Sequence, residues 1–283
     1  MNSTLPEQLT ETQRGSVNAW QCDVNRHWNV QFYCRHFDQA ARFLALGAGA
    51  GPADPLPPTR HLRYHAELVA GDIFRISSAR IADGAHAGSL VHYMHHAGSG
   101  RLIATALDGQ AARFDCTAVP QAAVAEALPR SIGGGPEQPL VHQRVLDAGG
   151  LASVRCWVTM SQCTAAGEMT QEHLVGMFAD AAGHVWERAG AGVVWLRENG
   201  LGRAAVEMKL SHYVPARAGD ALVIYSWVGP TRGKSIMLQH QLCRLPGNEP
   251  IARSDVTALL IDMQTRRSVA MPPLGATTPE GSR

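Results

Sequence analysis

The sequence predicts an α+β protein made of two tandem copies of one unit, each a long helix packed against an antiparallel sheet. Two observations predict this. Related segments recur in the same order at nearly constant spacing along the 283 residues. Each recurrence contains one helical pattern followed by several stretches of alternating apolar and polar residues, which are typical of half-buried strands.

The repeat rests on three pairs of segments that agree in order. They are Ala-Gly-Asp at 70–72 and 218–220, Ile-Ala at 103–104 and 251–252, and related helical runs that begin at Phe37 and Phe178. The first two pairs are 148 residues apart and the helical runs are 141 apart. An insertion of seven residues between helix and first long strand reconciles the two spacings, which favours duplication over chance.

The periodicity places one helix and four long strands in each copy, after a short leading strand. The helices are expected at about 30–46 and 171–189. The strands are expected at 61–68, 73–82, 89–96 and 102–115 in the first copy, and at 204–214, 221–228, 235–244 and 251–262 in the second.

Proline and glycine mark the boundary between the copies. Residues 119–141 contain four prolines and the run Gly133-Gly134-Gly135, which predicts a linker, partly helical around 121–128. The expected organisation is therefore an N-terminal repeat at 14–118, a linker at 119–141 and a C-terminal repeat at 142–272. The remaining segments, 1–13 and 273–283, are expected to be flexible tails.

Composition excludes several classes of function. The chain is 45% hydrophobic and 17% charged with a net charge of +1, which gives no electrostatic reason to expect nucleic acid as a partner. No apolar stretch is long enough for a membrane span. Six cysteines without a CxxC pair are expected to be reduced thiols. Because the N-terminus lacks the apolar core of a signal peptide, we expect a cytoplasmic protein.

The stretch "CDVNRHWNVQFYCRHF" begins at Cys22 and places chemically capable side chains just before the first helix. Asn29 stands where an N-cap is expected, and the helix N-terminus carries partial positive charge that suits a developing oxyanion near Val30. If the preceding segment is extended, Asp23, Asn25 and His27 project to one side, where an acid could activate water or attack directly. Each residue also has an ordinary reading as a cap, a turn residue or a surface histidine.

The same stretch resembles the signature of hotdog-fold thioesterases, especially the 4-hydroxybenzoyl-CoA thioesterase-like branch. Asp23, His27, Asn29, Tyr33 and Ala40 fit that signature. The alternation of Asp23, Asn25 and His27 is also similar to plant acyl-carrier-protein (ACP) thioesterases. The resemblance implies two tandem hotdog folds, in which an antiparallel sheet wraps a long central helix. It also implies hydrolysis of an acyl thioester, with Asp23 as general base or nucleophile.

The second copy departs from this pattern. At the 141-residue spacing, Asp23 falls on Thr164, Asn25 on Ala166 and His27 on Glu168. Glu168 could still serve as a carboxylate base, but one active site per chain is the expectation. The plant enzymes also use a carboxylate on the following strand, and Glu67 is the residue that this neighbourhood offers.

We therefore expect an acyl-CoA thioesterase, with an acyl-ACP thioesterase as the alternative carrier class. A hydratase of the same fold and a non-catalytic acyl-thioester binding protein stay open, because "DVNRHW" is close to the hydratase pattern D-x-N-P-x-H but lacks its proline. No cofactor is expected. No metal is expected either, since His92 and His96 of "HYMHH" would share one face of a strand while His95 points away. A homo-oligomer is possible for such a fold.

Overall fold

The computed structural model describes residues 9–47, 49, 57–109, 116–133 and 137–272. The chain divides into two compact units, unit 1 (Met1–Pro136) and unit 2 (Glu137–Arg283). Several predicted features lie outside the described residues: the tail segments 1–8 and 273–283, the end of the expected strand at 110–115, and two glycines of the linker at 134 and 135.

Unit 1 contains an antiparallel sheet in the order β1-β3-β4-β5-β2, with β6 added in parallel beside β3. Its strands are β1 (Thr10–Ser16), β2 (Thr59–Tyr64), β3 (Ile73–Ile81), β4 (Leu90–His96), β5 (Leu102–Gly109) and β6 (Ala118–Val119). Short 3-10 helices are η1 (Ala19–Gln21), η2 (Gly84–His86) and η3 (Gln121–Ala127). The expected N-terminal boundary at residue 14 falls within β1.

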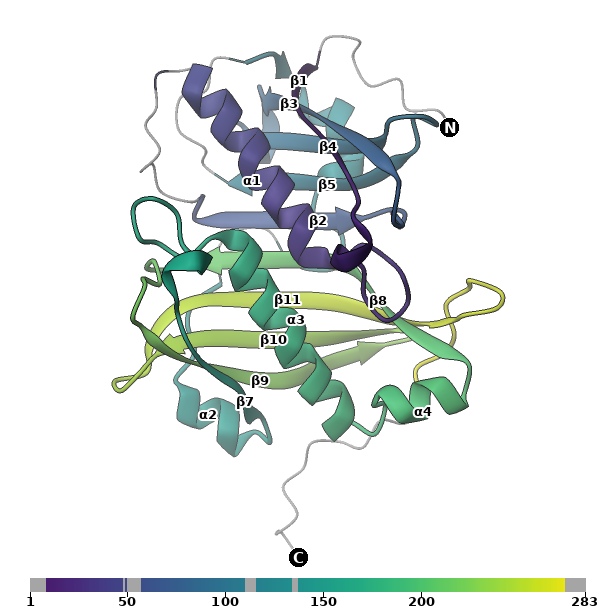
Figure 1. The fold of residues 1–283 in the computed structure, drawn as a ribbon, viewed down its shortest axis with the longest axis vertical. Coiled ribbons are helices and arrows are strands. Elements are labelled where there is room, and N and C mark those ends of the chain that lie inside the picture. Colours follow the sequence, from purple (N-terminus) through teal and green to yellow (C-terminus); the bar gives the residue numbers. More distant parts are fainter. Residues whose placement is uncertain (1–8, 48, 50–56, 110–115, 134–136, 273–283) are drawn as a thin grey trace, which may run out of the picture. The chain divides into compact units, whose positions relative to one another are not determined.

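Helix α1 (Val30–Gly47) lies across one face of this sheet (Figure 1). Its buried residues include Tyr33, Phe37, Ala40 and Leu44, which recur at the helical period that the sequence predicted. The apolar stripe faces the sheet, and its burial holds the helix in place. The polar stretch at 23–29 directly precedes the N-terminus of this helix.

Unit 2 repeats the plan, with a sheet in the order β8-β11-β10-β9-β7. Its strands are β7 (Leu151–Trp157), β8 (Leu201–His212), β9 (Ala221–Arg232), β10 (Ser235–Arg244) and β11 (Glu249–Asp262). Its helices are α2 (His142–Asp147), η4 (Met160–Gln162), α3 (Gln171–Arg188) and α4 (Val193–Glu198). Helix α3 crosses one face of the sheet, as α1 does in unit 1 (Figure 1).

The predicted α+β class and the duplicated helix-and-sheet unit are confirmed. The duplication is also visible in the strand register. His92 of β4 pairs with Ser78 of β3, and the residues 148 positions later, His240 of β10 and Ser226 of β9, pair in the same way. The short helix α4 was not predicted, because six residues are too few to reveal a helical period.

The segment expected as a linker packs on the second face of the unit 1 sheet, and helix α2, just beyond that segment, packs on the unit 2 sheet. In unit 1, Val119, Val124 and Ala127 join a buried apolar cluster with strand residues such as Val91 and Tyr93. In unit 2, Val145 of α2 packs with Val223, Tyr225 and Cys243. These residues are therefore integral parts of the units that they cover. No helix among the described residues is long and apolar enough to cross a membrane, and all six cysteines are free thiols.

Candidate active site

The polar stretch before α1 forms a tight loop that Cys22 and Trp28 close with an antiparallel bridge. Inside it, the Asp23 N–H donates to the His27 carbonyl at 2.8 Å, and the Arg26 N–H donates to the Asp23 carbonyl at 2.9 Å. Arg26 adopts a left-handed conformation with φ of 64°. The segment is therefore a closed turn, not an extended strand, so simple alternation does not set the directions of its side chains.

The Asp23 carboxylate stabilises this loop. Its Oδ1 accepts the Asn25 N–H at 2.8 Å and the His27 N–H at 3.1 Å. Asp23 is exposed, and both bonds come from its own loop, as in an Asx turn. Because Oδ1 is engaged, any general-base or nucleophilic role for Asp23 would fall to Oδ2.

The loop brings His27 against Glu67, the carboxylate that the sequence placed near the site without a register. His27 Nδ1 lies 3.2 Å from Glu67 Oε1, and a backbone bridge joins His27 to Val69. The His27 side chain is 15% exposed and that of Glu67 is 38% exposed. A carboxylate beside Nδ1 orients the imidazole ring and favours the tautomer that carries a proton on Nδ1.

Asn29 and Val30 form the start of α1. Asn29 Oδ1 accepts the Gln31 N–H at 3.2 Å, and the Asn29 N–H donates to the Gln21 carbonyl at 2.9 Å. Asn29 thus caps the helix. The Gln31 N–H already donates to Asn29, so it could bind an oxyanion only if this hydrogen bond broke. The partial positive charge of the helix N-terminus would attract an anion without any such change.

Tyr33 is buried one turn into the helix. Its hydroxyl accepts the Leu68 N–H at 3.4 Å, and its ring makes an edge contact with Tyr64. Burial is the main reason that the pKa of Tyr33 lies well above its usual value, and the nearby carboxylates of Glu67 and Asp23 add to the rise. Tyr33 is therefore a neutral hydroxyl beside the His27–Glu67 pair.

Unit 2 contains the same loop without the same chemistry. Cys163 and Met169 close it, the Thr164 N–H donates to the Glu168 carbonyl at 2.8 Å, and Gly167 has the left-handed conformation with φ of 75°. Glu168 Oε1 lies 2.7 Å from an Arg217 guanidinium nitrogen. The loop shape therefore does not require an Asp, an Asn or a His, and Glu168 is paired with a cation.

Sequence reasoning missed a polar network beneath α1. Arg60 binds Asp108 through two hydrogen bonds of 2.6 Å, and both side chains are almost fully buried. His92 Nε2 lies 3.5 Å from Asp108 Oδ2, and His92 Nδ1 lies 2.6 Å from Ser78 Oγ. The Arg60 guanidinium and His92 lower the pKa of Asp108 well below its usual range, against the effect of burial.

A shorter version of this network occurs in unit 2. Ser226 Oγ lies 2.7 Å from His240 Nδ1 and 2.7 Å from Ser153 Oγ. The repeat spacing of 148 residues links Ser78 to Ser226 and His92 to His240, so this spacing was the signal that could have exposed the network.

Comparisons with known proteins agree with this fold. Residues 158–274 match the family model described as Thioesterase-like superfamily. An acyl-ACP thioesterase from Bacteroides thetaiotaomicron is similar over 87% of this chain and 96% of its own, with 11% identity and a TM-score of 0.59. The 12:0-ACP thioesterase from Umbellularia californica is similar over 91% of this chain and 93% of its own, with 11% identity and a TM-score of 0.56. None of the curated proteins that were compared matches the chain.

The chain has the double-hotdog fold of these solved structures, and within unit 2 residues 158–274 match the thioesterase-like superfamily model. The family match covers most of unit 2, whereas the Asp23, Asn25 and His27 triplet lies in unit 1.

Proposed function

We propose that unit 1 hydrolyses an acyl thioester at the loop formed by residues 22–28 and the N-terminus of α1. The observation that carries this proposal is the His27–Glu67 pair, 3.2 Å apart, beside a helix N-terminus. A histidine oriented by a carboxylate can take a proton from water, and the helix end favours the negative charge that develops on the thioester oxygen. Unit 2 has Glu168 and Arg217 in this place.

The roles follow from the contacts. His27 acts as general base through Nε2 and Glu67 orients it, as the acid does in a catalytic triad. Water attacks the thioester carbon, the carbonyl electrons move to the oxygen, and collapse of the tetrahedral intermediate expels the thiolate, which takes up a proton. Asp23 holds the loop through Oδ1, and the half-buried Asn25 side chain contributes to positioning water or substrate. Tyr33 supplies a buried, neutral hydroxyl next to Leu68.

The carrier is coenzyme A or ACP. The names of the two solved structures favour ACP, whereas the sequence signature favours coenzyme A. We therefore propose a phosphopantetheine thioester and leave the two carriers as separate arms of the test.

The test is thiol release from acyl-CoAs and acyl-ACPs by the full chain and three variants. We expect His27→Gln and Glu67→Gln to lower kcat by about 100-fold or more, the usual scale for a general base and its partner. Asp23→Asn should lower kcat less, because its Oδ1 can still accept the loop N–H groups. If Asp23 is instead the base or nucleophile through Oδ2, Asp23→Asn abolishes the reaction and Glu67→Gln spares it.

Two other classes give different results. A hydratase would consume the double bond of crotonyl-CoA without thiol release, which follows as a loss of absorbance. A non-catalytic binding protein would bind acyl-CoA and release no thiol from any carrier. Either outcome refutes the proposed hydrolysis.

A further inference from the structure

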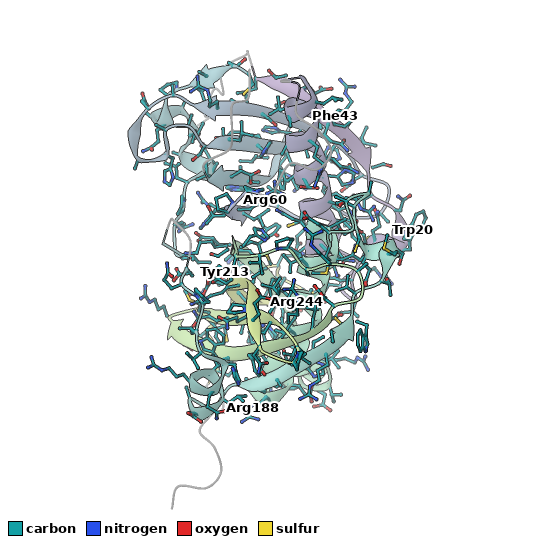
Figure 2. The ribbon with its side chains drawn as sticks, turned by 90° about the vertical axis from the view of Figure 1, so that its left-hand side faces the viewer. Trp20, Phe43, Arg60, Arg188, Tyr213 and Arg244 are labelled. Atoms are coloured by element: carbon teal, nitrogen blue, oxygen red, sulfur yellow. The ribbon has the colours of Figure 1, made fainter. Side chains whose placement is uncertain are left out.

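The interior of unit 1 carries a buried ion pair, formed by Arg60 and Asp108. Arg60 and Asp108 are opposite residues on β2 and β5, with side-chain exposures of 0% and 2%. Cys34 and Asp38 of α1 interact electrostatically with Arg60, so the pair lies close to this helix. Arg60 is labelled in Figure 2. The two short hydrogen bonds of the pair fix both side chains in one geometry.

Unit 2 has alkyl side chains in the same register. Met208 and Val256 are opposite residues on β8 and β11, each 148 residues beyond Arg60 and Asp108, and both are buried. The surroundings are otherwise kept, since Phe37 packs near His92 and Phe178 packs near His240. The fold therefore accepts an apolar pair at this position, and the charged pair in unit 1 is not a requirement of the architecture.

Contacts through two tyrosines link the proposed site to the strand that carries Arg60. Tyr33 accepts the Leu68 N–H beside Glu67, and its ring contacts that of Tyr64 at 5.4 Å between centroids. Tyr64 lies four residues after Arg60 on β2. The Tyr64 hydroxyl is buried without a hydrogen-bond partner among the described residues. A buried hydroxyl of this kind suits a polar group or water more than an alkyl chain.

We propose that the Arg60–Asp108 pair is a specificity determinant that closes the space beneath α1 to long alkyl chains and restricts the acyl group to a short one. An acyl group whose carbonyl lies at the N-terminus of α1 can extend into solvent or beneath the helix, and only the second path buries its methylenes. A long chain on that path must desolvate or displace a buried ion pair, which is costly. A short chain ends before the pair. This inference rests on the proposed hydrolysis at the same site.

The experiment measures kcat/KM for butyryl, decanoyl and palmitoyl thioesters of coenzyme A and of ACP. The full chain is compared with the double variant Arg60→Met/Asp108→Val, which introduces the residues of unit 2. The matched control is Met208→Leu/Val256→Ile, a conservative change at the equivalent positions. We expect wild type and control to prefer butyryl thioesters on the carrier that is accepted. The double variant should raise the palmitoyl-to-butyryl ratio by about tenfold or more, on the scale of methylene discrimination in an apolar pocket.

The outcomes separate the two proposals. Thiol release from none of the thioesters refutes the proposed hydrolysis itself. Wild-type activity that favours palmitoyl thioesters overturns the specificity inference, whether or not the double variant folds. A folded double variant with the wild-type chain-length ratio overturns it as well, while the hydrolysis proposal stands. A shift toward long chains in the double variant but not in the control supports it.

Discussion

At the scale of single residues, the two units differ most where they bury polar groups. Unit 1 holds Arg60, Asp108 and His92 beneath its helix, whereas unit 2 keeps the histidine and serine, His240 and Ser226, but has apolar residues in place of the charged pair. Burial of a charge is tolerated only with a well-placed partner. Removing one member of such a pair is therefore different from removing both.

We expect Arg60→Met alone to lower the free energy of unfolding by about 3–5 kcal/mol, because it leaves the buried Asp108 carboxylate without its main partner. The double variant Arg60→Met/Asp108→Val should lie within about 1 kcal/mol of wild type or above it. Urea denaturation followed by circular dichroism measures both values. Equal losses in the single and double variants would contradict this account.

His240 gives unit 2 a dependence on pH. Burial lowers the pKa of His240 to about 3, so the folded state binds its proton less readily than the unfolded state does. Stability from this group is complete above about pH 6.5, the ordinary value for histidine, and is lost as the pH falls toward 3.

The expected loss between pH 7 and pH 5 is about 2 kcal/mol, at about 1.4 kcal/mol per pH unit below 6.5. His240→Gln keeps a group that can bond Ser226 but does not titrate, so its stability should change less over this range. Urea denaturation of both proteins at the two pH values measures the difference. A His240→Gln variant as acid-sensitive as wild type would show that His240 is not the cause.

At the scale of elements, local sequence patterns predicted the helices well, but they did not predict which side chains pair between distant segments. The period of apolar residues located α1 and α3 within a residue or two, because burial of one face acts within a single segment. The pairs His27–Glu67 and Arg60–Asp108 join segments whose relative register no local pattern determines. The sequence alone allows an extended segment at 22–28. The structure has a closed turn there, in which Arg26 adopts the left-handed conformation.

Two glycines of unit 2, one in a loop and one in a helix, make opposite predictions about stability. Gly167 has φ of 75° and open space around its missing Cβ, so Gly167→Ala should cost about 1 kcal/mol through conformation alone. Gly183 lies inside α3, also with open space, and Gly183→Ala should stabilise by up to about 1 kcal/mol. Thermal unfolding of the two variants measures these opposite signs. A Gly167→Ala variant as stable as wild type would mean that the loop can adopt a conformation that does not need a left-handed residue at 167.

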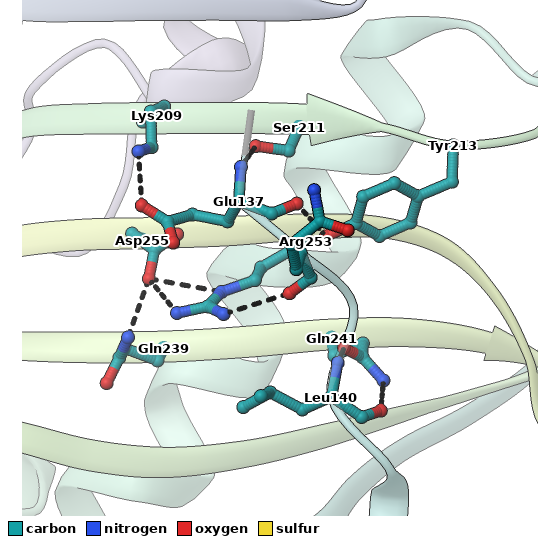
Figure 3. Close-up of polar contacts among 10 residues, drawn as sticks. Glu137, Leu140, Lys209, Ser211, Tyr213, Gln239, Gln241, Arg253 and Asp255 are labelled. Atoms are coloured by element: carbon teal, nitrogen blue, oxygen red, sulfur yellow. Dashed lines mark hydrogen bonds and ion pairs between the residues drawn. The ribbon is translucent and has the colours of Figure 1, made fainter. Parts of the chain in front are cut away.

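At the scale of the whole chain, each unit is completed by the segment between the repeats, but by different forces. Unit 1 covers its sheet with apolar side chains from η3. Unit 2 binds the extended residues 137–140 with polar side chains of its sheet (Figure 3). Lys209 Nζ lies 2.6 Å from Glu137 Oε1, the Glu137 N–H donates to Ser211 Oγ, and the Tyr213 hydroxyl donates to the Glu137 carbonyl.

Gln241 binds this segment through two short hydrogen bonds to the backbone of Leu140. Its Oε1 accepts the Leu140 N–H at 2.6 Å and its Nε2 donates to the Leu140 carbonyl at 2.7 Å, and the Gln241 side chain is fully buried. Truncation of Gln241 removes both bonds and leaves backbone groups to find other partners, a loss of about 1–3 kcal/mol. The segment should then open locally more often than the rest of unit 2.

We therefore expect Gln241→Ala to be cut after Glu137 by a glutamate-specific protease faster than wild type, by about tenfold or more for a loss near 1.4 kcal/mol. Mass spectrometry of the fragments locates the cut. Gln143→Ala, which removes only an exposed bond to Asp147 on α2, serves as the control and should be cut at the wild-type rate. Equal rates in wild type and Gln241→Ala would show that the remaining contacts of Glu137, with Lys209, Ser211 and Tyr213, hold the segment without Gln241.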